Sequence, residues 1–174
     1  MLEKIKDIQR AIENRAYLAA LVLALTLPDI CGKIAYPGMR TSERYTKWFD
    51  EYVIKERFPE GYPDELKFDG RKLYKLRCAL LHEGSVQGVP DVDSFELRII
   101  ESDPPGMYGA SSYSVTKCND GSCHFRVTLD IVVICLDICT KAENFYKSHK
   151  DKSIFDDQNI VVIKVPVKNS GLLK

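Results

Sequence analysis

The chain has 174 residues and a mass of 19.8 kDa, enough for one hydrophobic core and therefore for a single domain over residues 1–174. Its 25 lysine and arginine residues balance 25 aspartate and glutamate residues, so any binding of nucleic acid or anionic lipid must come from a local patch. With 45% hydrophobic and 29% charged residues, the composition excludes disordered, collagen-like and coiled-coil proteins.

The longest apolar stretch, residues 16–27, is shorter than the roughly 18 to 20 residues that a membrane-spanning helix needs. The residues before it include Glu3, Asp7 and Glu13, which are atypical of a secretory signal peptide. We therefore expect a cytoplasmic protein. Because the cytoplasm keeps thiols reduced, we expect the six cysteines of the chain to serve in packing or metal binding more than in a disulfide framework.

Four helices are predicted from the spacing of apolar residues, and we expect them to pack as a bundle. The first covers residues 3–27 as one long helix, which Pro28 ends, with a short helical turn then following through Lys33. The second begins at Thr41 or Ser42, either of which can cap it, and runs to about Phe58.

A third helix is predicted over residues 70–82, with Asp69 as its N-terminal cap and Gly84 as its terminator. After a loop, residues 95–100 alternate between apolar and polar side chains as a half-buried strand does. Residues 113–117 and 124–128 flank an Asn-Asp-Gly turn and are predicted to form a hairpin.

The fourth helix is predicted over residues 131–149. Residues 160–165 are rich in β-branched side chains, which favours a further edge strand. The fold class is therefore mainly α. A small antiparallel β insertion at about residues 95–128 separates the third helix from the fourth, and we expect its strands to lie apart from the bundle.

Arg77 lies inside or beside the apolar stripe of the third predicted helix, which Leu73, Leu76 and Leu80 form. A guanidinium cannot lose its charge, so beside a core it needs a carboxylate partner, a cleft or a subunit interface. One explanation is a structural ion pair with an acid that the sequence does not identify. The other is a functional site.

His82 follows Arg77 by five residues, about 140° around an ideal helix, so a straight helix would not bring the two side chains together. They can share a site if the helix ends at His82, or if a two-fold dimer supplies residues from both subunits. Alternatively, His82 is a hydrogen-bonded residue at a helix end.

Basic residues cluster on this same helix, in a chain without net charge. They indicate a phosphate-binding or RNA-binding patch, although a solvated helix face has the same pattern. The candidate residues are Arg71, Lys72 and Lys75.

An arginine followed four to six residues later by histidine, near a helix end in a small helical protein, resembles the signature of the HEPN (higher eukaryotes and prokaryotes nucleotide-binding) superfamily. Here the signature runs from Arg77 to His82. A wider pattern resembles a set of uncharacterised bacterial proteins. Its carriers are residues 27–33, Arg44, Tyr45, Trp48, Phe49 and residues 74–84.

This resemblance implies an up-and-down four-helix bundle that forms a homodimer and cleaves RNA without a metal or other cofactor. It implies a role in phage defence, in a toxin–antitoxin pair with a protein partner, or in RNA processing. Arg77 would hold the phosphate and His82 would serve the ribose 2′-hydroxyl. The sequence departs from many active members at Cys78, where they have a polar residue, and the alternative is a non-catalytic dimeric binding or scaffold module.

The cysteines suggest a second kind of site. Cys118 and Cys123 flank a four-residue turn, and His124 is adjacent, as in half of a zinc site. No other half is present in the sequence pattern. We therefore expect no zinc and mostly reduced thiols.

Overall fold

A computed structural model describes residues 1–55, 60–61, 67–84, 92, 94–99, 113–117 and 123–158. Only the backbone is described for residues 113–117, 123–125 and 156–158. The protein is mainly helical with a small β-sheet, as the sequence predicts. The strand predicted at residues 160–165 lies outside the described residues.

The first predicted helix is two helices, α1 (Leu2–Glu13) and α2 (Tyr17–Ala24). Arg15 separates them with a φ of 57°, a left-handed conformation. The Arg15 N–H donates to Ile12 O at 2.9 Å, and the Ala16 N–H donates to Ala11 O at 2.8 Å. These two bonds form a Schellman motif, which ends α1 without the glycine that usually marks such a helix end. The prediction of one continuous helix was therefore wrong.

Pro28 begins a helix here instead of ending one. Helix α3 (Leu27–Ala35) has Pro28 in its first turn, where the missing N–H of proline leaves no helical hydrogen bond unmade. By length and composition alone, Tyr17–Ala35 is apolar enough to cross a membrane. The core helix of a soluble protein and a signal sequence both pass the same test, and 44% of the tested window is buried inside the protein.

The second and third predicted helices both continue beyond their α-helical part as π-helical segments. Helix α4 (Thr41–Phe49) leads into η1 (Asp50–Ile54), and α5 (Gly70–Cys78) leads into η3 (Ala79–Glu83). The expected caps of α5 are confirmed, because the Asp69 side chain accepts the Lys72 N–H and Gly84 ends η3 with a φ of 62°. The cap position of α4 is Arg40, not Thr41 or Ser42.

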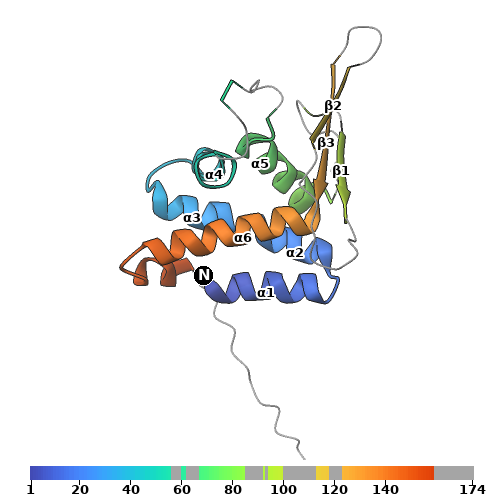
Figure 1. The fold of residues 1–174 in the computed structure, drawn as a ribbon. Coiled ribbons are helices and arrows are strands. Elements are labelled where there is room, and N and C mark those ends of the chain that lie inside the picture. The colour runs from blue at the N-terminus through green and yellow to red at the C-terminus, as the bar shows by residue number, and fades with distance from the viewer. Residues whose placement is uncertain are drawn as a thin grey trace, which may run out of the picture.

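Helix α6 (Ile131–Ser148) lies along α1, with α2 and α3 also packed against it (Figure 1). Its N-terminus is capped by the buried Asp130, whose carboxylate accepts the Val133 N–H at 2.8 Å. Helices α3 and α4 pack together, and α4 packs in turn against α5. A short 3-10 helix, η4 (Ser153–Gln158), follows α6.

The sheet has three strands in the order β1-β3-β2. The hairpin prediction is confirmed, because β2 (Tyr113–Lys117) pairs antiparallel with β3 (Cys123–Asp130). The prediction of a purely antiparallel sheet was wrong, because β1 (Ser94–Arg98) pairs parallel with β3, with Phe95 opposite Val127. Phe95, Val127 and Leu129 belong to the main hydrophobic core, so the sheet is joined to the helices instead of lying apart.

Candidate functional site

Arg77 projects from α5 into a half-buried position beside two tyrosine rings. Its guanidinium carbon lies 6.0 Å from the centre of the Tyr45 ring and 5.9 Å from the centre of the Tyr74 ring. Both distances are within the range of a cation–π interaction. The two rings meet edge to face with their centres 5.2 Å apart. Arg77 is thus held by aromatic contacts from α4 and from its own helix.

The two tyrosines are kept neutral by their surroundings. Tyr45 is fully buried, and burial raises its phenol pKa well above 10, although the nearby Arg77 charge acts in the opposite direction. Burial also raises the pKa of Tyr74, and a hydrogen bond between its phenol and the Cys78 thiol adds to the increase. Neither phenol is therefore a proton acceptor or donor of the kind that titrates near neutral pH.

Within the described residues, no carboxylate forms an ion pair with Arg77. Asp29 is the carboxylate whose charge raises the phenol pKa of both tyrosines. It already forms an ion pair with Arg44. Nε and Nη2 of Arg44 bind Oδ1 of Asp29 at 2.9 and 2.8 Å. A structural ion pair of the predicted kind exists in this region, but Arg44 makes it.

Two buried polar atoms in this cluster have no hydrogen-bond partner among the described residues. They are the Tyr45 hydroxyl and Nε of Arg77. Buried polar groups in proteins are nearly always hydrogen-bonded, and exceptions concentrate at sites that bind an ion, a water molecule or a ligand. The Arg77 cluster, defined as Arg77, Tyr45, Tyr74 and Cys78, therefore has unused capacity to bind an acceptor group.

His82 lies in η3, is exposed, and makes no hydrogen bond, ion pair or ring contact within the described part of the chain. A π-helical segment has i→i+5 hydrogen bonds and more residues per turn than an α-helix. Each residue of η3 therefore rotates by less than 100°, which reduces the angle between Arg77 and His82 below the value of about 140° for an ideal α-helix. No contact joins the two side chains within the described chain.

The three basic residues predicted to bind phosphate lie in different surroundings. Arg71 is exposed and Lys75 is half-buried, and both line a groove between α4 and α5. Lys72 is buried, and its ammonium donates to Lys67 O at 2.6 Å and lies 4.0 Å from the Asp69 carboxylate. Because its charge is held inside the protein, Lys72 does not belong to a surface patch, which corrects that part of the prediction.

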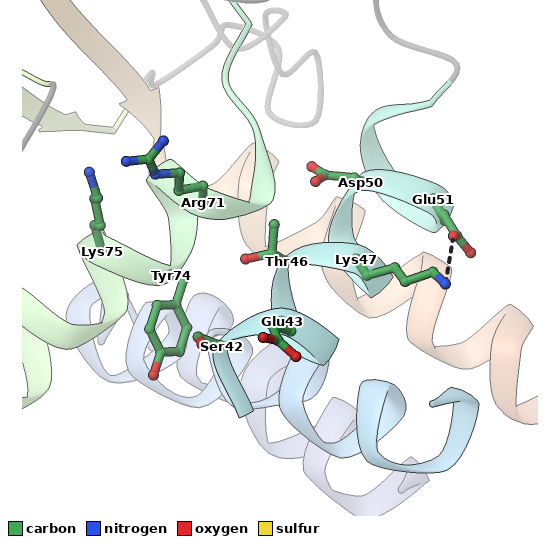
Figure 2. Close-up of a pocket in the computed structure, with 9 residues that line it drawn as sticks. All are labelled: Ser42, Glu43, Thr46, Lys47, Asp50, Glu51, Arg71, Tyr74 and Lys75. Carbon is green, nitrogen blue, oxygen red and sulfur yellow. Dashed lines mark ion pairs between the residues drawn. The ribbon is translucent and has the colours of Figure 1, made fainter. Parts of the chain in front are cut away.

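The groove between α4 and α5 has a volume of about 740 Å³. Its two walls carry opposite charge (Figure 2). Arg71 and Lys75 lie on α5, whereas α4 and η1 carry three carboxylates and Lys47, a net charge of −2 on that wall. The carboxylates belong to Glu43, Asp50 and Glu51. This acidic wall weakens the attraction of the groove for an RNA backbone, which is wholly anionic.

Tyr74 connects the groove to the Arg77 cluster, because its ring lines the groove and also lies beside the guanidinium. The sequence pattern predicts no chemical role for Tyr74, Tyr45 or Asp50, although Tyr45 and Tyr74 lie in the wider pattern that resembles bacterial proteins. The positions of these three residues in the Arg77 cluster and the groove depend on how α4 packs against α5, and no local sequence pattern encodes that packing.

The cysteines remain outside this site. Cys31, Cys135 and Cys139 are buried, and burial raises the pKa of all three thiols, that of Cys139 to about 12. Cys118 lies outside the described residues, and only the backbone of Cys123 and His124 is described. Among the described residues, no group of three His, Cys, Asp or Glu side chains is placed to hold a metal ion. The predicted absence of zinc stays a prediction.

Comparisons of the chain with protein-family models, with curated proteins and with solved structures found no match. The residues and their geometry therefore carry the functional interpretation.

Proposed function

We propose that the protein is a metal-independent endoribonuclease of the HEPN type, in which Arg77 binds the scissile phosphate and His82 transfers the proton of the ribose 2′-hydroxyl. The observation that carries this proposal is the Arg77 guanidinium, which is held by two tyrosine rings and has no carboxylate partner within the described chain. A structural arginine beside a core would be paired with an acid.

The proposed chemistry needs two groups. Attack of the 2′-hydroxyl on phosphorus requires a base that titrates near neutrality, and a histidine side chain meets that requirement. The developing phosphorane requires a fixed positive charge, and an arginine fork is suited to binding phosphate oxygens. Nε of Arg77 has no hydrogen-bond partner within the described chain but is buried, so phosphate binding would use the Nη groups of the guanidinium. The expected products are a 2′,3′-cyclic phosphate and a 5′-hydroxyl.

The proposal includes a HEPN-like four-helix bundle, a homodimer and a cytoplasmic location. A two-fold axis near residues 70–84 would place two Arg77 and two His82 side chains around one groove. Leu81, an exposed leucine beside His82, would contribute apolar area to that interface. Light scattering at tens of micromolar protein tests the dimer, and a monomer at that concentration would exclude the composite groove.

The test is cleavage of a mixed RNA in EDTA by the wild-type protein, Arg77→Ala and His82→Ala. Loss of a positioned acid–base group lowers rates by about 10² to 10⁴. The matched control is Arg10→Ala, which removes an exposed arginine on α1 whose pair with Asp7 lies at the surface. The enzyme proposal fails if the wild type cleaves no RNA or if His82→Ala cleaves as fast as the wild type.

A second candidate is a non-catalytic RNA-binding or scaffold module, favoured by the absence of any contact between His82 and Arg77 in the described chain. An inactive wild-type protein that binds RNA with a steep salt dependence would support this function. Under either function, phage defence or a toxin–antitoxin pair with a protein antitoxin is the proposed biological setting.

A further inference from the structure

The groove between α4 and α5 has the charge distribution of a site for a small dipolar ligand. Arg71 and Lys75 are four residues apart on α5 and so lie on one face of that helix. Figure 2 places them across the groove from Asp50 and Glu51, with Thr46 between the two walls. An anionic group of a ligand would lie beside the basic wall, and a cationic group beside the acidic wall.

Asp50 is the most buried of the three carboxylates in the acidic wall. Its Oδ1 accepts the Gly70 N–H at 2.6 Å, and within the described chain no cation forms an ion pair with it. The neighbouring Lys72 donates instead to a backbone carbonyl. A half-buried carboxylate without a cation is energetically unfavourable. A cationic ligand group beside Asp50 would relieve that cost.

Burial raises the pKa of Asp50 to about 6, and the hydrogen bond from Gly70 offsets only part of the increase. The charges that face it are those of Asp69 and Glu51, which raise the pKa further, and of Lys72, which lowers it. Glu51 is engaged differently, because it accepts a hydrogen bond from Tyr36 and lies 3.8 Å from the Lys47 ammonium. Glu43 is exposed and remains solvated, so Asp50 is the carboxylate of this wall that would gain most from a cation.

The two walls are held close together and in fixed positions. A Cβ atom built on Gly70 would lie 2.4 Å from the backbone oxygen of Thr46 and 2.8 Å from its Cα. Only glycine permits this approach of α5 to α4. A volume of about 740 Å³ is within the range of small-molecule sites, which are usually formed before the ligand binds.

We propose that this groove binds a basic α-amino acid, with its side-chain cation beside Asp50 and its carboxylate beside Arg71 and Lys75. Packed helices lie about 8 to 10 Å apart, so the opposite charges of the ligand must be separated by several bonds. L-arginine and L-lysine meet this requirement, and glycine does not. The acidic wall disfavours RNA, because every charge along an RNA backbone is negative.

The test is calorimetric titration of the full chain with L-arginine, L-lysine, glycine and agmatine, which is arginine without its carboxylate. We expect L-arginine or L-lysine to bind saturably and agmatine and glycine at least about tenfold more weakly, because a hydrogen bond to a charged group is lost. Arg71→Gln should weaken binding of the amino acid by about tenfold or more without affecting agmatine. Asp50→Asn should weaken both.

Lys33→Gln is the matched control, since it removes an exposed positive charge outside the groove. Arg77→Ala is a second control, because it removes a residue of the proposed nuclease site and none of the residues that line the groove. The proposal is overturned if neither amino acid binds, if agmatine binds as tightly, or if Lys33→Gln weakens binding as much as Arg71→Gln. It is also overturned if a single-stranded ten-nucleotide RNA binds more tightly and depends on Arg71.

Discussion

The Arg77 guanidinium lies beside the ring of Tyr74, 5.9 Å from its centre, and this contact replaces the ion pair that a half-buried arginine normally makes. Tyr45 provides a similar contact at 6.0 Å. Cation–π interactions at such positions contribute about 0.5 to 1 kcal/mol each. Arg77 is therefore anchored weakly, and its Nε is buried without a hydrogen-bond partner in the described chain.

Arg77→Ala should lower the free energy of unfolding by only about 1 to 2 kcal/mol, from the lost contacts with the two rings. Arg44→Ala is the matched comparison, because it leaves the half-buried Asp29 carboxylate without its partner and should cost more. Urea denaturation of both variants measures the difference. A loss of 3 kcal/mol or more in Arg77→Ala would indicate a carboxylate partner after all.

Asp50→Asn should stabilise the protein at pH 7, by an amount that depends on pH. The pKa of Asp50 rises from 3.8 to about 6 in the folded state, so folding takes up a proton between these values. The contribution of this group to stability is present below pH 3.8 and is lost as pH rises through about 6.

Because Asp50 remains partly exposed, solvent screening reduces the expected gain in Asp50→Asn to about 1 kcal/mol at pH 7. The gain should vanish near pH 4, where the wild-type carboxyl is already protonated. Denaturation curves of both proteins at pH 4, 5.5 and 7 give the comparison. A variant less stable than the wild type at pH 7 would show that ionised Asp50 has a favourable partner.

The sequence predicted the elements whose ends are set by local chemistry. Asp69 was predicted as the N-terminal cap of the third helix and Gly84 as its terminator, and both are confirmed. Hairpin β2–β3 was predicted from its turn residues. Each of these features depends on contacts within a few residues along the chain, and such contacts leave a pattern in the sequence.

Features that depend on distant contacts were missed. The parallel pairing of β1 with β3 joins strands about thirty residues apart, and nothing local distinguishes it from antiparallel pairing. In the candidate site, Arg77 was found because a charge interrupts an apolar stripe. Tyr45 and Asp50 were not, because their roles arise where α4 meets α5.

Gly70→Ala should destabilise the protein by about 1 to 3 kcal/mol, although alanine normally favours helices over glycine. The added Cβ would meet the backbone oxygen and Cα of Thr46, so α5 would have to move away from α4. Thermal denaturation measures the effect. Adding Thr46→Ala should not restore stability, because the clash involves the backbone, and a rescue would contradict the close backbone approach.

Arg15→Gly should raise the free energy of unfolding, by up to about 1 kcal/mol. Arg15 has a φ of 57° in the Schellman motif at the end of α1, a left-handed conformation that costs about 1 to 2 kcal/mol for a residue with a Cβ. Glycine avoids that cost but loses about 0.5 to 1 kcal/mol through its greater freedom in the unfolded chain. Arg15→Ala is the control, because it removes the exposed side chain and keeps the Cβ. If urea denaturation shows Arg15→Gly to be no more stable than Arg15→Ala, the break between α1 and α2 does not depend on a left-handed residue.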